Sequence, residues 1–479
     1  MDHYQRSLLK PPDPMTWRSP NLLRLAAPAL ALMLALAGGS AAAAASGDEA
    51  VARHSRALIV GSDVDFQIAL AALRTRGKPD AAAAMILALR YRRQAVWDLS
   101  EALEEVTGHA ALGWFDWMLW QEAHPEIEPH PSFTELKLYT LRRVDPNFLS
   151  FFRHDWAEPG NMKIRLEEIT WGGVAADAIP ALDYPKLIAA AEADYLRGDD
   201  LVFGVEINGD ARAYPLRIMG WHEMFNEVIG GVPVALAYCT LCGSGILFET
   251  RVEGREQPFV FGSSGLLYRS NKLMFDRETD SLWNQFTGQP VVGPLAGSGI
   301  ALQIRPVVIV TWAKWRTAHP DSRVLSLDTG HRRDYRSGVV YAEYFASPDL
   351  MFPTRADESR LRQKDYVFGI RDIGAAKAWP LAAFADRAVI NDAVGNRTVV
   401  LIGDAGARSV RAYERGGRSF ESAAEENRLR GPGGLWQVTE EALLGPGGTR
   451  LARVPGHLAY WFAWDGYLGV QSELYQPPE

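Results

Sequence analysis

The spacing of apolar residues changes along the chain from a helical period to a strand-like one. Between residues 64 and 124, apolar side chains recur every three or four positions with charged residues between them. This period predicts amphipathic helices. From residue 164 onward, short apolar runs alternate with Gly, Pro, Asn and Asp, which predicts strands at 201–207, 232–238, 246–252, 258–261 and 307–311. The predicted fold class is therefore α+β, with a helical region followed by a β-rich region.

A weak internal repeat divides the β-rich region. Residues 202–234 and 367–399 are identical at 11 of 33 positions at an offset of 165, and tryptophan-containing segments follow in the same order in each copy. We expect a duplicated domain whose second copy is shorter and degenerate. The predicted boundaries are a signal peptide at 1–45, a helical region at 46–160, the domain with the candidate site at 161–355 and the second copy at 356–479.

The amino terminus has the pattern of a secretory signal. Basic residues precede an apolar run at 25–37, and small residues follow this run up to Ser46. The run is shorter than the roughly 20 residues that a membrane-spanning helix needs. We expect cleavage near Ala45 and a mature protein in the periplasm or another extracytoplasmic compartment. A retained N-terminal membrane anchor is the alternative.

The overall charge narrows the classes of partner. Lys and Arg number 50 and Asp and Glu number 58, so the formal net charge is −8. A basic excess that could bind a nucleic-acid backbone is absent, and the sequence contains no phosphate-binding loop. We therefore expect an unknown small molecule or protein as partner, no nucleic acid, and no stable membrane span after signal cleavage.

The only two cysteines, Cys239 and Cys242, lie three positions apart at the end of a predicted strand, and three interpretations compete. A structural disulfide closes so small a loop that it adds only about 2 kcal/mol to stability. A redox-active dithiol suits the spacing but lacks a thioredoxin-like βαβ context. A metal site formed by both thiolates and His222 suits copper or zinc, with Glu223, His331 or water as a fourth ligand.

The repeat adds an argument about the cysteines. At the offset of 165, the second copy has Asp404 in place of Cys239 and Ala407 in place of Cys242. If this type of domain needed the cysteines in order to fold, the second copy would not lack them. We therefore expect the pair to serve a function, to lie close to His222, and to be replaceable by serine without loss of folding.

A second polar segment, residues 262–288, has two interpretations. One is a glycine turn, a strand and a solvated loop. The other is a pocket wall that carries the candidate residues Tyr268, Asn271, Arg277, Trp283 and Gln285. A serine nucleophile is not expected, because neither Ser263 nor Ser264 lies in a G-x-S-x-G motif.

Several motifs together resemble one known family. They are N-G-D-A-R-A-Y-P at 208–215, W-H-E at 221–223, Y-C-T-L-C-G-S at 238–244, D-R-E-T-D-S-L-W at 276–283 and D-T-G at 328–330. Between about residues 172 and 344 the chain resembles the bacterial and archaeal domain-of-unknown-function family 3179. It departs from the family at Thr240, where Pro is usual, and at His331, where Tyr is usual.

Membership would imply an exported protein, but it brings no reaction with it. The predicted function is therefore an exported protein with a Cys-Cys-His metal centre or a redox centre. The alternative is a non-enzymatic binding or scaffold protein with a structural disulfide. Whether the protein is an enzyme is left open.

Overall fold

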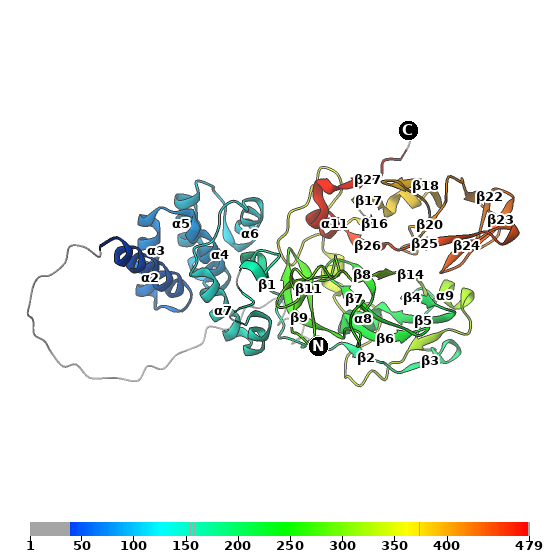
Figure 1. The fold of residues 1–479 in the computed structure, drawn as a ribbon, viewed down its shortest axis with the longest axis horizontal. Helices are drawn as coiled ribbons and strands as arrows, with labels where there is room; N and C mark the ends of the chain where they lie inside the picture. The colour runs from blue at the N-terminus through cyan, green and yellow to red at the C-terminus, as the bar shows by residue number, and fades with distance from the viewer. Residues whose placement is uncertain (1–38, 154, 158, 373, 478–479) are drawn as a thin grey trace, which may run out of the picture. The chain divides into compact units, whose positions relative to one another are not determined.

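A computed structural model describes residues 39–477 apart from 154, 158 and 373 (Figure 1). The chain divides into two compact units, Met1–Arg143 and Val144–Glu479. Most of the predicted signal peptide, 1–45, lies outside the described residues. Within the described part of the chain, no helix combines the length and the apolar character that a membrane span needs.

The first unit is helical, as the apolar spacing predicts. Helices α2 to α6 contribute to a hydrophobic core that includes Leu70, Leu99 and Trp117, each almost completely buried. Helix α3 begins after Ser62, whose hydroxyl accepts the Asp65 N–H while the Asp65 carboxylate accepts the Ser62 N–H. The helices are α2 (Gly39–Val60), α3 (Asp63–Arg76), α4 (Ala82–Tyr91), α5 (Val96–Thr107), α6 (Gly113–Ala123) and α7 (Phe133–Val144).

The second unit is rich in strands, which confirms the predicted α+β class. The first half of this unit, which contains strands β1 to β15, has three five-stranded sheets; the second half contains strands β16 to β27. One has the order β1 (Ile169–Trp171), β9 (Phe261–Tyr268), β10 (Asn271–Asp276), β11 (Leu282–Asn284) and β12 (Gln289–Val292). The next has the order β13 (Ile304–Arg305), β8 (Ser244–Glu249), β7 (Val232–Cys239), β6 (Met224–Ile229) and β2 (Leu182–Asp183). The third has the order β14 (Val308–Thr311), β4 (Leu201–Ile207), β5 (Asp210–Pro215), β15 (Arg323–Leu325) and β3 (Leu187–Ala189).

The second half contains two further sheets (Figure 1). The four-stranded sheet has the order β26 (His457–Tyr460), β16 (Tyr366–Asp372), β17 (Ala375–Pro380) and β27 (Ser472–Leu474). The eight-stranded sheet has the order β18 (Val389–Val394), β19 (Arg397–Asp404), β20 (Ser409–Glu414), β25 (Arg450–Val454), β24 (Ala442–Leu444), β23 (Gly434–Val438), β22 (Arg428–Gly431) and β21 (Glu421–Ser422). The helices of the second unit are α8 (Leu216–His222), α9 (Trp312–Ala318), α10 (Ala342–Ala346) and α11 (Trp461–Leu468).

One predicted strand is misplaced. Of the strand expected at 258–261, only Phe261 belongs to a strand. β9 begins at this residue and continues through the glycine-rich segment to Tyr268. Small residues are needed there because a Cβ on Gly262 would lie 2.5 Å from a neighbouring phenylalanine ring. Gly265 has a φ of +77°, which favours glycine. These glycines therefore allow close packing and bending within a strand, although in the sequence they resemble a turn.

Matching tryptophans pack against a glycine in each half of the second unit. A Cβ on Gly204 would lie 2.2 Å from the Trp315 ring, and one on Gly369 would lie 1.8 Å from the Trp464 ring. The indole N–H of each tryptophan donates to a serine hydroxyl in its own half. The same contact between a strand and a short helix therefore occurs twice.

The two halves pack through two pairs of strands. β26 of the second half contacts β8 of the first, and β14 of the first half contacts β20 of the second. The Tyr460 N–H at the end of β26 donates to the Cys242 carbonyl at 2.8 Å. The turn that carries the cysteines therefore lies where the halves meet.

Candidate functional site

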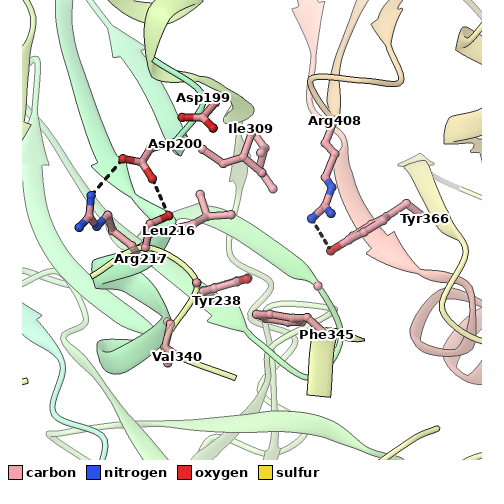
Figure 2. A pocket seen from close by; sticks show the side chains of 15 residues that line it. Asp199, Asp200, Leu216, Arg217, Tyr238, Ile309, Val340, Phe345, Tyr366 and Arg408 are labelled. Atoms are coloured by element: carbon pink, nitrogen blue, oxygen red, sulfur yellow. Dashed lines mark hydrogen bonds and ion pairs between the residues drawn. The ribbon is translucent and has the colours of Figure 1, made fainter. Parts of the chain in front are cut away.

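A cavity of about 240 Å³ lies beside the cysteine turn, between the two halves of the second unit (Figure 2). The first half contributes Tyr238 and Gly243, which flank the cysteine pair in the sequence, and the second half contributes Tyr366 and Arg408. The Tyr366 ring packs on Gly243, where an added Cβ would lie 2.8 Å from a ring carbon. The cysteine turn therefore borders a space of small-molecule size.

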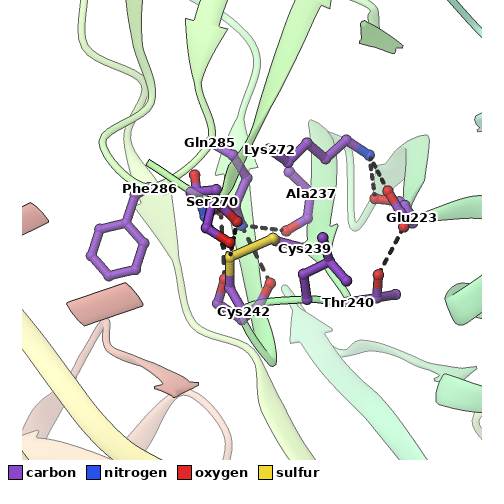
Figure 3. Close-up of a disulfide and its surroundings, with 12 residues drawn as sticks. Glu223, Ala237, Cys239, Thr240, Cys242, Ser270, Lys272, Gln285 and Phe286 are labelled. Carbon is purple, nitrogen blue, oxygen red and sulfur yellow. Dashed lines mark hydrogen bonds and ion pairs between the residues drawn. A yellow bond between two sulfur atoms is a disulfide. The ribbon is translucent and has the colours of Figure 1, made fainter. Parts of the chain in front are cut away.

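A disulfide joins the two cysteines across the turn between β7 and β8 (Figure 3). Their Cα atoms are 5.2 Å apart, and neither residue is more than 1% exposed. The Cys242 N–H donates to the Cys239 carbonyl and the Gly243 N–H to the Thr240 carbonyl, each at 3.2 Å. Gly243 has a φ of +60°, which glycine adopts without strain. The backbone therefore closes this turn independently of the sulfur–sulfur bond.

Asn271 contacts the sulfur of Cys242. Its Nδ2 donates to Cys242 Sγ at 3.1 Å and to Gln285 Oε1 at 2.9 Å. The orientation of Gln285 is fixed, because its own Nε2 donates to backbone carbonyls of β7 and β8. Asn271 Oδ1 is buried and has no hydrogen-bond partner among the described residues. The Ser270 carbonyl oxygen lies 3.5 Å from Cys242 Sγ.

A buried ion pair is connected to the same turn (Figure 3). Lys272 Nζ lies 3.3 Å from Glu223 Oε2, and the two residues are 3% and 7% exposed. Glu223 Oε1 accepts hydrogen bonds from the Thr240 hydroxyl at 2.8 Å and the Tyr341 hydroxyl at 3.1 Å. Burial lowers the pKa of Lys272, and the Glu223 carboxylate opposes that shift. Because Thr240 lies between the cysteines, this carboxylate is joined directly to the cysteine turn.

We expect Glu223→Gln to destabilise the second unit, because it leaves the Lys272 ammonium buried without a counter-ion. Breaking a buried ion pair lowers the free energy of unfolding by about 3–5 kcal/mol. The double variant Glu223→Gln with Lys272→Met removes both charges and should recover much of that loss. Chemical denaturation of the three proteins checks this. Equal losses in the single and double variants would contradict the assignment of Glu223 as the counter-ion of Lys272.

His222 lies at the end of α8 and forms hydrogen bonds through both ring nitrogens. Nδ1 donates to the Pro180 carbonyl at 2.9 Å, and Nε2 accepts the Tyr335 hydroxyl proton at 2.6 Å. The Tyr335 oxygen lies 2.7 Å from the Thr329 hydroxyl. The His331 ring is 5.2 Å from the His222 ring, centroid to centroid. Burial lowers the pKa of His222 to about 4, so the ring is neutral at pH 7.

The neutral state of His222 has a consequence for stability. Between pH 6.5 and about 4, the unfolded chain binds a proton at this residue that the folded protein does not bind. The free energy of unfolding should therefore fall by at most about 3 kcal/mol as the pH decreases through this window. In His222→Asn that part of the pH dependence should disappear. Denaturation curves at several pH values check this, and an unchanged difference between pH 7 and pH 4 would assign the effect to other groups.

The five pocket candidates separate in the structure. Asn271 and Gln285 lie at the cysteine pair, as described above. The other three form contacts elsewhere: Trp283 donates to Asp276 at 2.9 Å and Arg277 pairs with Asp177 at 2.7 Å within the first half. Tyr268 packs edge-on against Tyr467 of the second half, at 5.9 Å between ring centroids. Two of the five candidates therefore lie at the cysteine pair, and the Ser270 carbonyl of the same segment also approaches Cys242 Sγ.

Several polar neighbours of this site were not predicted from the sequence. Lys272 had a usable signal, because a lysine inside the mostly apolar strand 271–276 must either reach solvent or find a buried partner. No feature of the sequence indicated a role for Tyr335 or Tyr341. They lie in a segment without a regular hydrophobic pattern. Only the fold brings Tyr335 to His222 and Tyr341 to Glu223.

The predicted metal ligands are only partly brought together. His331 lies beside His222, whereas Glu223 faces Lys272. Among the described residues, no group of three or more His, Cys, Asp and Glu side chains is arranged to hold a metal ion. In the disulfide form the two sulfurs are bonded to each other. The copper or zinc site therefore stays a prediction, and it would require the reduced protein.

A comparison with protein families gives the class of the chain. The family described as "Protein of unknown function (DUF3179)" matches residues 176–470, which is more than half of the chain. The chain therefore belongs to this family, and the match covers both halves of the second unit. Neither the curated proteins nor the solved structures contain a significant match.

Proposed function

We propose that Cys239 and Cys242 form a reversible redox centre that cycles between a disulfide and two thiols in an exported protein. Reduction adds two electrons and two protons, which a partner dithiol supplies and which oxidation returns to a partner disulfide. The observation that carries the proposal is the set of polar groups around Cys242 Sγ. A hydrogen-bond donor and a hydrogen-bond acceptor both lie within 3.5 Å of this sulfur, which suits a thiolate and a thiol.

The contact with Asn271 distinguishes the two sulfurs. A hydrogen bond from Nδ2 at 3.1 Å stabilises negative charge on Cys242 Sγ, so Cys242 is the better leaving group. An incoming thiolate then attacks Cys239, forms a mixed disulfide and releases Cys242 as a thiolate. A second thiol attacks the mixed disulfide and releases Cys239, and two protons complete the dithiol. The Ser270 carbonyl can accept the resulting Cys242 S–H.

The unpartnered oxygen of Asn271 favours the reduced state. A buried acceptor without a donor costs about 1–3 kcal/mol. Reduction creates S–H donors at the cysteine pair, one of them on Cys242 Sγ, which already contacts this amide, whereas the disulfide offers none. For a two-electron couple, this amount corresponds to roughly 20–65 mV toward a more oxidising potential. A disulfide that served only as a cross-link would gain nothing from such an arrangement.

We also infer that the second unit arose by duplication. Asn226 bonds both backbone groups of Phe261, and Asn391, 165 positions later, bonds both backbone groups of Phe420. The tryptophan–glycine contacts described above recur in the same way. This supports comparing equivalent positions in the two halves.

The equivalent turn of the second half lacks a disulfide. There the Ala407 N–H donates to Asp404 Oδ1 at 3.0 Å, and the Arg408 N–H donates to the Ala405 carbonyl at 3.3 Å. A side-chain hydrogen bond thus takes the place of the cross-link. This supports a chemical role for the cysteines, since the turn can form without them.

The contacts around the cysteines and His222 support a metal site less well than a redox centre. Reduction frees two thiolates, but His222 could join them as a ligand only by giving up the Pro180 carbonyl or the Tyr335 hydroxyl. Export to an oxidising compartment, which residues 1–45 predict, also favours a disulfide over free thiolates. We therefore prefer the redox proposal to the copper or zinc site.

The redox potential tests this proposal. We expect the wild-type disulfide to be reduced reversibly in the folded protein at a potential above roughly −300 mV, the range below which structural disulfides of secreted proteins lie. Asn271→Leu, which removes both the donor and the unpartnered acceptor, should shift the potential by roughly 20–65 mV to more negative values. Equilibration in glutathione and dithiothreitol buffers, followed by alkylation and mass measurement, gives both potentials.

Asn284→Ala is the matched control, because Asn284 is also buried but caps a neighbouring backbone turn without contacting sulfur. Its potential should equal that of the wild type. Reduction of the wild type only under conditions that unfold the protein would contradict the redox proposal.

Serine variants separate chemistry from folding. We expect Cys239→Ser and Cys242→Ser to remain folded, with a loss of about 2 kcal/mol from the free energy of unfolding, because the disulfide closes a very short loop. Thermal melts and chemical denaturation check this. Unfolded serine variants would show that the cysteines are structural. Metal analysis of reduced wild type after exposure to copper and zinc tests the alternative, and one bound ion lost in both variants would favour the metal site.

A further inference from the structure

The cavity between the two halves is lined by equivalent positions of both. Leu201 and Tyr366 are 165 residues apart and both line it, as do Gly243 and Arg408. Gly243 and Arg408 also share a left-handed backbone conformation, with φ of +60° and +50°. Figure 2 shows the two residues of the second half on one side of this space and aliphatic residues of the first half on the other. The same turn therefore contributes a residue without a side chain in one half and a guanidinium in the other.

The cavity is separate from the disulfide. Tyr238 lines it, whereas neither Cys239 nor Cys242 does. Successive side chains of a strand point to opposite faces of the sheet, so Tyr238 and Cys239 of β7 face away from each other. A molecule bound in the cavity is therefore recognised by groups other than the sulfurs.

Tyr238 brings a hydroxyl without a partner to this space. The residue is only 5% exposed and lines the cavity, and its hydroxyl forms no hydrogen bond within the described part of the chain. The Phe203 ring packs edge-on against it, at 5.1 Å between ring centroids, which fixes its orientation. Burial raises the pKa of Tyr238, so the hydroxyl keeps its proton and can donate it. Buried polar groups normally have hydrogen-bond partners, so this hydroxyl is available to a bound molecule.

Arg408 adds a positive charge held in place at the same cavity. Its guanidinium lies 5.0 Å from the centroid of the Tyr366 ring, and Nη1 donates to the Tyr366 hydroxyl at 3.4 Å. Among the described residues no carboxylate forms an ion pair with it, whereas Arg217, the other arginine of the cavity, pairs with Asp200 at 3.0 Å. Asp199 also lines the cavity, but it is exposed and no contact in the described structure fixes its side chain. The charge that is both positioned and uncompensated is therefore positive.

The charge and the hydroxyl face one space with a mainly apolar lining. The positive charge of Arg408 opposes the rise in the pKa of Tyr238, which places the two groups near each other. The remaining wall includes the side chains of Leu216, Ile309 and Val340. Pockets for drug-sized ligands usually measure about 300–1,000 Å³. A cavity of about 240 Å³ therefore suits a smaller molecule, with an apolar body and one anionic group.

We propose that this cavity binds a small carboxylate with an apolar body of about the size of benzoate. The carboxylate accepts hydrogen bonds from the Arg408 guanidinium and the Tyr238 hydroxyl, and the body packs against the aliphatic wall. This binding site is a further function of the second unit, and it does not depend on the redox chemistry proposed above, because the cysteines do not line the cavity.

Three molecules of similar shape and different charge test the site: benzoate is anionic, benzamide is neutral and benzamidine is cationic at neutral pH. Isothermal titration calorimetry with the folded wild-type protein gives the dissociation constant of each. We expect benzoate to bind about fivefold more tightly than benzamide, as one partly exposed charge contact allows, and benzamidine to bind most weakly. Equal affinities, a preference for benzamidine, or no benzoate binding at millimolar concentrations would overturn the site.

Two variants place the ligand in the cavity. Arg408→Gln should lower the affinity for benzoate about fivefold and change the affinity for benzamide by less than about twofold. Tyr238→Phe should lower both affinities about fivefold, because benzoate and benzamide can each accept the hydrogen bond that is lost.

The matched controls are Arg316→Gln and Tyr214→Phe. Arg316 is an exposed arginine on α9 and Tyr214 is a buried tyrosine on β5, and neither lines the cavity. Both controls should keep the wild-type affinities. Benzoate binding that neither Arg408→Gln nor Tyr238→Phe weakens would place the ligand outside the cavity and overturn the site.

Discussion

The hydrogen bond from the Tyr460 N–H to the Cys242 carbonyl joins the two halves of the second unit at the turn that carries the cysteines. A second bond, from the Tyr344 hydroxyl to the Leu241 carbonyl at 2.7 Å, satisfies the neighbouring peptide. A buried carbonyl without a donor costs about 1–3 kcal/mol, so these two hydrogen bonds lower the cost of burying the turn. The contacts that hold the halves together therefore also keep water away from the sulfurs. Access of solvent or of a reductant to the disulfide therefore depends on the interface between the halves.

Burial also explains why the polar neighbours of the disulfide matter. The Glu223–Lys272 pair and the amides of Asn271 and Gln285 lie in surroundings from which water is excluded, where electrostatic interactions are strong and unpaired groups are costly. Glu223 is joined to the turn through Thr240, and Asn271 contacts the sulfur of Cys242 directly. A change of charge or protonation at the cysteines is therefore transmitted to groups that cannot exchange their partners for water.

The sequence predicted the fold class and the strand that leads into the cysteine turn, because both depend on local apolar spacing. It misplaced the strand at 258–261, because Gly262 and Gly265 resemble a turn and are in fact required by close packing within β9. Of the site, the sequence identified the cysteines and Asn271, which lie in dense motifs. It did not identify Lys272 or the cavity, because a buried ion pair and a space between two halves depend on contacts between segments that are distant in the chain.

The central claim is that the Cys239–Cys242 disulfide is a redox centre whose surroundings also suit the reduced thiols. The most direct test compares the free energy of unfolding of the oxidised and reduced wild-type protein by chemical denaturation under otherwise identical conditions. The account predicts that the reduced protein loses no more than about 2 kcal/mol, the chain-entropy contribution of so short a loop, since the new S–H groups find acceptors already in place. A reduced protein that is unfolded, or that loses much more than this amount, would show that the disulfide is a structural cross-link and would contradict the account.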